Sequence, residues 1–369
     1  RLVIWNRADL TKPQRVEKIH TAPIAALSMS PDGKTIATAS WDSSIAMTPL
    51  EGGTTRRLEG HQGNVNGVGF LLKKNKVDSH FGLGSILSPN QVKVTAEDGS
   101  QSILDTRNIV IATGSEVTPL PGVTIDEKIV VSSTGALDLE KVPQHFVVIG
   151  AGVIGLELGS VWRRLGAKVT VVEYLDRILP GLDLEVTKQF QRMLEKQGIA
   201  FELGQKVTKV ESKNNSAKVS LEPAQGGASR QIDADIVLVA IGRRAFTAGL
   251  GLDIIGIASD RGKILIDDHF RTNIPNIYAI GDAAEKHDAV DGSSSLIPLA
   301  NLANRHGRVT ADHIANRRIR DVGAIGTAIV KVFDLAIATT GWSAKRLTSA
   351  KTANDPNSRI NKSLRKWNC

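Results

Sequence analysis

Apolar and polar positions follow their most regular pattern near the middle of the chain, where they predict a strand, a helix and a second strand. The run at 147–149 consists of β-branched residues, as is typical of a buried strand. Apolar residues then recur at helical spacing over 153–165. A second β-like run follows at 168–172. The order of these three segments predicts a βαβ unit with two parallel strands.

The segments that follow this unit extend the same architecture. Their patterns predict a helix at 184–196, a strand at 199–203, an antiparallel excursion at 206–222 and a buried strand at 236–241. Strands that alternate with helices are typical of an α/β fold. We therefore predict a doubly wound, Rossmann-type nucleotide-binding domain that is interrupted by a β-meander.

Three glycines connect the first strand of the βαβ unit to its helix, in the spacing Gly-x-Gly-x-x-Gly. Gly150 permits a tight turn, Gly152 lets the backbone approach a pyrophosphate, and Gly155 lets helix and strand pack closely. Glu173 ends the second strand, where its carboxylate suits ribose hydroxyls and repels a 2′-phosphate. Tyr174 follows and offers that phosphate no positive charge. We therefore predict NAD(H) as the cofactor, in preference to NADP(H); the alternative is a strand-to-helix turn without a ligand. The predicted site comprises Gly150, Ala151, Gly152, Val153, Ile154, Gly155 and Glu173.

Residues 1–70 have a different, all-β pattern. Short β-like runs at 24–30 and 35–40 flank a Ser-Pro-Asp-Gly turn, and His20 and Trp41-Asp42 stand on either side. A second copy begins at Gly60-His61. This segment resembles the WD40 repeat, but it covers only about one blade, whereas propellers contain about four to eight. We expect a WD40-like blade fragment with open edges, through which a protein partner could bind.

The composition is that of an ordinary globular protein, with 41% hydrophobic and 23% charged residues. No run is long and apolar enough to span a membrane, and no secretory signal is visible, so we expect a cytoplasmic protein without a membrane partner. The net charge of +8 is concentrated at residues 302–369, which hold 13 basic and 4 acidic side chains. We favour a solvated basic tail over a nucleic-acid-binding segment, because no aromatic residues are interleaved with the charges. No metal site is expected.

Residues 71–284 contain a series of motifs that resemble one family. These motifs are Lys73–Val77, Ile109–Ser115, Ser132–Leu137, Gly150–Gly155, Asp176–Pro180, Val239–Arg244 and Asn276–Asp282. Together they resemble the dihydrolipoamide dehydrogenases, which are flavin-dependent pyridine nucleotide-disulfide oxidoreductases. The resemblance adds Gly242 to the predicted NAD-binding residues.

The same resemblance implies that FAD is a second cofactor, bound at a partial site. In this family, the motif that contains Thr113, Gly114 and Ser115 closes the flavin domain, and the residue matching Asp282 binds near the flavin. The residue matching Glu157 faces the nicotinamide, which makes Glu157 a candidate catalytic residue. The alternative is that Glu157 is a first-turn acid that stabilises the helix dipole.

Residues 285–347 resemble a second branch of the superfamily, the coenzyme A-disulfide reductases and NADH oxidases, which continue into a dimerisation domain. The motifs are Asn304–Arg308, Ala311–Ile314 and Gly326–Leu335, and the match stops near Leu347. An oligomer is therefore a further expectation. The predicted division is a WD40-like fragment (1–70), a partial FAD segment (71–142), the NAD-binding domain (143–271), a returning FAD segment (272–320), a truncated dimerisation domain (321–347) and a basic tail (348–369).

Two parts of the family pattern are missing from the sequence. There is no second glycine fingerprint for FAD, and the only cysteine is Cys369, so no redox cysteine pair is present. We expect the histidines at 269, 287, 306 and 313 to be surface or structural residues rather than catalytic ones. By resemblance the chain is an NAD-binding flavoprotein oxidoreductase without disulfide reductase activity. The alternatives are a non-catalytic NAD-binding module and a chimeric product of unrelated pieces.

Overall fold

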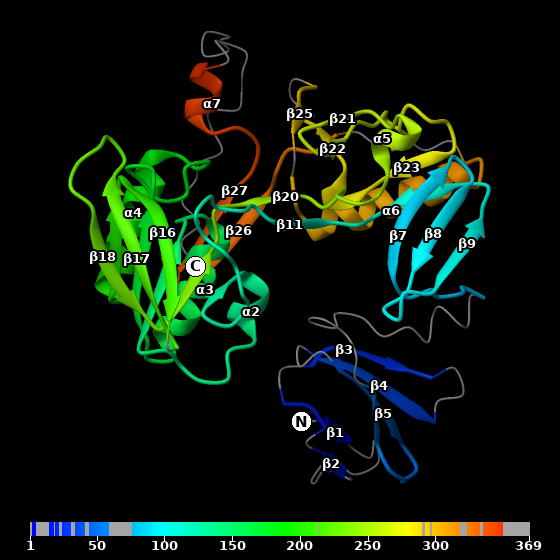
Figure 1. Ribbon diagram of the computed structural model, residues 1–369, viewed down its shortest axis with the longest axis horizontal. Helices are drawn as coiled ribbons and strands as arrows, with labels where there is room; N and C mark the ends of the chain where they lie inside the picture. Colours follow the sequence, from blue (N-terminus) through cyan, green and yellow to red (C-terminus); the bar gives the residue numbers. More distant parts are fainter. Residues whose placement is uncertain are drawn as a thin grey trace.

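The chain folds into two α/β bodies that are linked by a pair of antiparallel strands, with an all-β segment beside them (Figure 1). The linking strands are β11 (Ser115–Val117) and β20 (Arg243–Ala245). The computed structural model describes residues 2–4, 15–17, 19–21, 24–30, 34–40, 44–58, 76–213, 215–289, 292–295, 297–317, 323–332 and 335–349.

The first body is built on a five-stranded sheet in the order β12-β19-β13-β14-β15, in which all neighbouring strands are parallel. Helices α2 (Ser133–Leu137), α3 (Val153–Arg164) and α4 (Leu184–Lys196) belong to this body. Helices and further strands cover both faces of this sheet. Strands that are buried on both faces need apolar residues at successive positions, which agrees with the apolar runs in this sheet. The strands are β12 (Val130–Val131), β13 (His145–Ile149), β14 (Lys168–Glu173), β15 (Ile199–Leu203) and β19 (Ile236–Val239).

The sequence prediction of this α/β body is confirmed. The predicted helix at 184–196 and strand at 199–203 have the bounds of α4 and β15. The predicted excursion is a three-stranded antiparallel sheet of β16 (Gln205–Lys213), β17 (Ser216–Pro223) and β18 (Arg230–Ala234). The last predicted strand, at 236–241, is shorter in the structure, where β19 ends at Val239.

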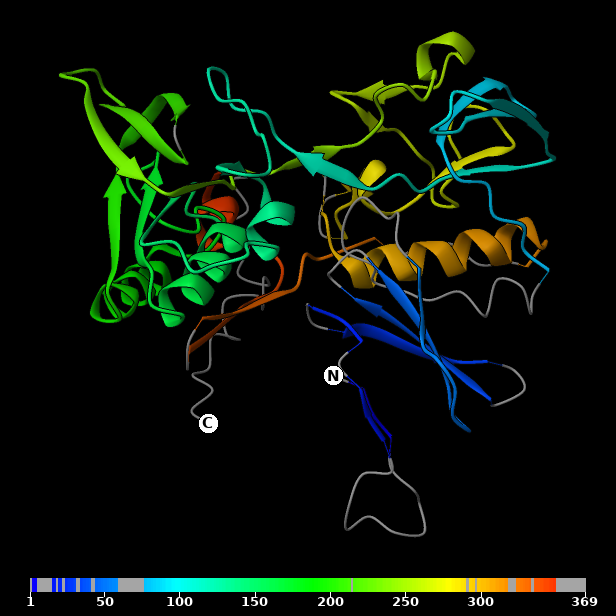
Figure 2. The same ribbon diagram turned by 60° about the horizontal axis from the view of Figure 1, so that its bottom comes forward.

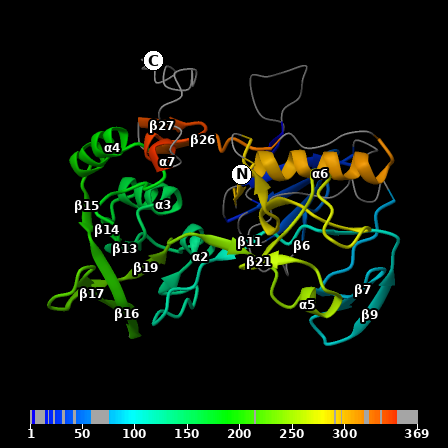
Figure 3. The ribbon, with the colours of Figure 1, turned by 90° about the horizontal axis from the view of Figure 1, so that it is seen from above.

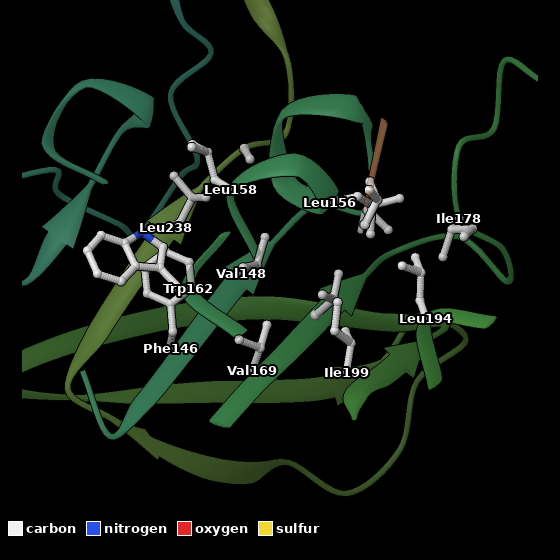
Figure 4. Close-up of a cluster of buried hydrophobic side chains, with 14 of the residues drawn as sticks. Phe146, Val148, Leu156, Leu158, Trp162, Val169, Ile178, Leu194, Ile199 and Leu238 are labelled. Carbon is white, nitrogen blue, oxygen red and sulfur yellow. The ribbon is translucent and has the colours of Figure 1, made fainter. Parts of the chain in front are cut away.

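The face that α3 buries agrees only in part with the apolar stripe that predicted the helix. Of that stripe, Leu156 is buried, whereas Val153, Val161 and Leu165 are 37%, 45% and 56% exposed. The other large side chains that α3 buries are those of Leu158 and Trp162, which lie over the sheet in Figure 4. The reason is that glycines at positions 155 and 159 give this helix a flat face, which approaches β13 and β14 closely and turns the neighbouring residues inward.

The second body brings together two segments that are far apart in the sequence. Strand β10 (Ile109–Ile111) pairs in parallel with β23 (Ile277–Ala279), so the predicted partial FAD segment and the returning segment share one core. Helix α6 (Ala300–Ile314) lies along this body (Figure 2). Its other elements are β7 (Leu83–Ser88), β8 (Gln91–Thr95), β9 (Gln101–Asp105), α5 (Leu252–Ile255), β21 (Ser259–Asp260), β22 (Lys263–Ile264), η1 (Gly281–Ala283), β24 (Lys286–His287) and β25 (Ser294–Ser295).

The described N-terminal residues are all-β, as predicted. Four strands form an antiparallel meander in the order β3-β4-β5-β6, and a separate pair is formed by β1 and β2. The ring nitrogens of buried His20 lie 2.8 Å from Thr38 Oγ1 and 3.0 Å from Ser44 Oγ. The predicted turn at 31–33, Trp41-Asp42 and the second copy from Gly60 lie outside the described residues. The strands are β1 (Leu2–Ile4), β2 (Arg15–Glu17), β3 (Ile24–Met29), β4 (Thr35–Ser40), β5 (Ile45–Pro49) and β6 (Arg56–Leu58).

The C-terminal elements return to the first body. Strands β26 (Ala328–Val332) and β27 (Leu335–Thr339) form a hairpin beside α3, and α7 (Ala344–Ser349) follows (Figure 3). Within the described ranges, no helix is long and apolar enough to cross a membrane. Cys369 and all but the first two residues of the predicted basic tail lie outside the described residues.

Candidate dinucleotide site

The glycine loop lies at the carboxyl end of β13, where the chain turns into α3. Gly150 has a φ of +107°, in the left-handed region, and a Cβ atom there would lie 2.5 Å from the Ala240 carbonyl oxygen. Gly152 is the N-cap of α3, and no atom lies within 4 Å of the place of its absent Cβ. A Cβ at Gly155 would overlap the Gly150 carbonyl oxygen. Gly150 and Gly155 are therefore required by close contacts within the fold, whereas Gly152 leaves open space in which a pyrophosphate can approach the backbone.

The carboxylate of Glu173 is fixed beside this loop. Its Oε2 accepts a hydrogen bond of 2.7 Å from the Ala151 N–H, and its Oε1 accepts one of 2.9 Å from the Leu175 N–H. The first of these bonds connects the end of β14 directly to the glycine loop. Because both oxygens also retain acceptor capacity, a ribose hydroxyl can bind here without displacing either backbone contact.

A cavity of about 1460 Å³ opens next to the loop and Glu173. Its lining includes the predicted residues Gly150, Gly152, Val153, Ile154, Glu173 and Gly242. The predicted residues Ala151 and Gly155 are fully buried behind it. Cavities at the carboxyl ends of parallel strands are the usual ligand sites of doubly wound sheets.

Glu157 also lines this cavity, one turn into α3. Burial raises the pKa of its carboxyl group above the usual value. The alternative interpretation of Glu157 as a first-turn acid is wrong, because α3 begins at Val153 and its first turn contains no acidic residue. A half-buried carboxyl group in a cavity has the features of a functional residue.

The residues predicted from the FAD motifs lie near the linking strands. Ser115 Oγ donates a hydrogen bond of 2.8 Å to Asp282 Oδ2, although the two residues are 167 positions apart. Gly114 has a φ of +74°, and Thr113 Oγ1 donates to the Phe246 carbonyl oxygen at 2.5 Å. The predicted residues are therefore brought together at the start of β11 and at η1.

Sequence reasoning missed three contributions to these two regions. Arg243 lines the cavity, and its Nε donates a hydrogen bond of 2.7 Å to Ser115 Oγ, which connects the cavity to Asp282. The first residues of α6, including Asn301, and the residues at the start of the hairpin, including Thr327 just before β26, also line the cavity. Arg243 lies two positions after the predicted strand at 236–241, next to the predicted residue Gly242, and this placement is a signal that the sequence offers. The other two walls depend on contacts between distant segments.

The four histidines are packed among protein groups. His306 is buried against the ring of Phe270, with ring centroids 4.3 Å apart. His269 and His313 stack at 4.5 Å, and His287 Nε2 lies 3.2 Å from the Ile266 carbonyl oxygen. These contacts agree with the expectation of structural histidines.

A model of one protein family, described as pyridine nucleotide-disulphide oxidoreductase, matches residues 18–307. The chain belongs to this family. It is 48% identical to dihydrolipoyl dehydrogenase 1, mitochondrial, of Arabidopsis thaliana over 255 residues, which are 68% of this chain and 50% of that protein. The chain thus spans about half the length of the curated relatives that it matches.

Two solved structures have a similar fold. The reduced CoADR-RHD of Bacillus anthracis is 28% identical, with a TM-score of 0.68, over 77% of this chain and 52% of that one. An NAD-dependent persulfide reductase from A. fulgidus is 29% identical, with a TM-score of 0.70, over 79% and 54%. The family is FAD-dependent and binds nicotinamide nucleotides, which agrees with both cofactor expectations at the level of the family.

None of the comparisons supports the WD40 resemblance, a WD40-type protein partner or a chimera. The family match begins at residue 18, inside the segment that resembles the repeat. The expected domain boundaries, oligomer and compartment remain predictions.

Proposed function

We propose that this chain binds NAD(H) in the cavity beside the glycine loop and acts as the nicotinamide-nucleotide part of a dihydrolipoyl dehydrogenase-like flavoprotein. The observation that carries the proposal is the hydrogen bond from the Ala151 N–H to Glu173. It fixes the carboxylate that suits the adenosine ribose beside the glycine loop that suits the pyrophosphate. The identities to dihydrolipoyl dehydrogenases support the choice of subfamily.

The residues present fit a nicotinamide dinucleotide. Gly152 leaves open space at the N-terminus of α3, and its missing side chain leaves the first-turn N–H groups without a side-chain cap. Such N–H groups bind anions, so this helix end suits the pyrophosphate. Glu173 suits the adenosine ribose. Glu157, with its raised pKa, lies in the same cavity and is the candidate to face the nicotinamide.

The described residues fit FAD only in part. Ser115 and Asp282 present polar groups beside the linking strands, and Arg243 adds a positive charge. The sequence contains no second glycine fingerprint to bind the FAD pyrophosphate. When FAD is bound, it supplies the acceptor for a hydride from the nicotinamide. The residues of this chain would hold and orient the nucleotide in the cavity.

Disulfide reduction is not part of the proposal. It requires a nucleophilic thiol and a second thiol that resolves the mixed disulfide, and the sequence contains one cysteine. We expect no disulfide-dependent NADH consumption when lipoamide is added together with FAD. Turnover that persists in Cys369→Ser would contradict this expectation, since no thiol would remain.

A nucleotide titration tests the proposed binding. NADH should quench or enhance intrinsic fluorescence saturably, and NADPH should bind at least about tenfold more weakly because its 2′-phosphate meets Glu173. Glu173→Ala should weaken NADH binding and reduce the discrimination between the two nucleotides. Glu202→Ala, which removes a carboxylate near the end of the neighbouring strand and outside the cavity, is the matched control. Equal affinity of the wild-type protein for NADH and NADPH would refute the assignment of Glu173.

A further inference from the structure

The C-terminal elements contact both α/β bodies. On the first body, the Ala344 N–H donates a hydrogen bond of 2.7 Å to Asp183 Oδ1, at the start of α4. The hairpin buries Val330, Val332 and Ile337 in the same core as α3. On the second body, the Ala324 N–H donates to the His287 carbonyl at 2.9 Å. This segment, residues 323–349, therefore spans the space between the bodies.

One buried carboxylate anchors the segment to the second body. Asp288 is 4% exposed, and its Oδ2 accepts a hydrogen bond from Trp342 Nε1 at 2.9 Å and forms an ion pair with an Arg346 guanidinium nitrogen at 2.8 Å. The Arg346 guanidinium also stacks over the Trp342 ring, 4.2 Å from its centroid. A buried carboxylate is costly unless it is paired, and Trp342 and Arg346 supply such pairing while the segment is docked.

Strand β26 lies between the Ala324 contact on one side and the contacts of residues 342–346 on the other, and the chain at its start is one wall of the dinucleotide cavity. Gly326 and Thr327, just before β26, and Ile329 on β26 line the cavity, and later residues of the strand pack into the core. Gly323 must be a glycine, because its φ is +81° and a Cβ would lie 3.0 Å from the His287 carbonyl oxygen. This wall is therefore attached by contacts at Asp183, His287 and Asp288, none of which lines the cavity, and by the packing of β26 into the core.

We propose that Asp288, Trp342 and Arg346 form a latch that holds β26 against the cavity, and that they are positioning residues for the bound dinucleotide. The second half of this inference rests on the proposed NAD(H) binding. Coupling between two sites is reciprocal, so if the docked latch favours nucleotide binding, bound nucleotide favours the docked latch by the same factor.

Hydrogen exchange and nucleotide titration together test the latch in the full chain. Arg346→Gln removes the ion pair at a side chain that is 43% exposed, so the fold should persist. Trp342→Phe keeps an aromatic ring, although a smaller one, and removes the N–H donor. The matched control is Arg230→Gln, whose side chain is 47% exposed and paired with Glu202 on β15, outside the cavity lining.

We expect Arg346→Gln to increase amide exchange at 326–332 without nucleotide and to weaken NADH binding about fivefold. Arg346→Lys should recover part of both effects, because it restores the charge but not the planar stack. In the wild type, NADH should slow exchange at 326–332 and at 342–347. Arg230→Gln should behave as the wild type in each measurement.

Each outcome decides one part of the inference. Unchanged exchange at 326–332 in both Arg346→Gln and Trp342→Phe would overturn the latch. Increased exchange with unchanged NADH affinity would overturn the positioning role and leave a purely structural contact. A wild-type chain that binds no NADH would refute the proposed function and with it the positioning role. Hydrogen exchange of the wild type and the variants without nucleotide would still decide whether the latch holds β26.

Discussion

Substitution of Gly155 by alanine gives the sharpest test of how the glycine loop is built. An added Cβ would overlap the Gly150 carbonyl oxygen and lie 3.0 Å from Val148 Cγ1, so α3 must move away from β13. Overpacking of this kind costs about 1–3 kcal/mol, and alanine returns up to about 1 kcal/mol through its higher helix propensity. We expect a net loss of about 1–2 kcal/mol in the free energy of unfolding.

The same substitution should weaken NADH binding more than it weakens the fold. The displaced residues include the N-cap Gly152 and the first turn of α3, which line the cavity. A shift of the helix end away from the pyrophosphate should raise the NADH Kd at least about tenfold. Urea denaturation measures the first effect, and a fluorescence titration measures the second.

Gly159→Ala is the matched control on the same helix. A Cβ there would lie 3.5 Å from Val169 Cγ1 and 3.6 Å from Val148 Cγ2, which is ordinary van der Waals contact. We expect unchanged NADH affinity and unchanged or higher stability, because alanine is favoured over glycine within a helix. If Gly155→Ala and Gly159→Ala gave the same stability and affinity, the argument from the close approach at Gly155 would be refuted.

Two further predictions concern pH. Burial raises the pKa of Glu157 in the fold, so its contribution to stability is present below the unfolded pKa and is lost as pH rises through the folded value. Glu157→Gln should therefore raise the urea midpoint at pH 7 relative to wild type and leave it unchanged below about pH 4.3. An increase in the midpoint that did not depend on pH would contradict burial of the charged carboxylate as the cause. Burial lowers the pKa of His313, and the charges of His269 and Arg271 lower it further. The contribution of His313 to stability is therefore present above its unfolded pKa and is lost as pH falls through its folded pKa. His313→Gln should flatten the stability profile on the acid side of about pH 6.5, as measured by urea midpoints, while an unchanged profile would exclude His313 as its source.

The sequence was sufficient for the parts of the fold that depend on local pattern. Strand β13, helix α3 and strand β14 follow one another with their glycines between them, so periodicity and turn chemistry predict the unit. The buried face of α3 was predictable from apolar spacing only at Leu156, because two glycines determine how the rest of the helix meets the sheet. A glycine carries no hydrophobic signal, yet it sets how closely the helix approaches the sheet.

The contacts that complete the cavity have no such local signal. Ser115 and Asp282 were associated only through resemblance to a family, and the hydrogen bond between them spans 167 positions. Asp288, Trp342 and Arg346 match no motif, since each alone is an ordinary polar or aromatic residue. Their relation depends on the path of the chain back from the second body to α3, over which no periodic pattern extends. Residues that recognise the dinucleotide can therefore be read from a βαβ fingerprint, whereas residues that position a cavity wall must be found in the folded chain.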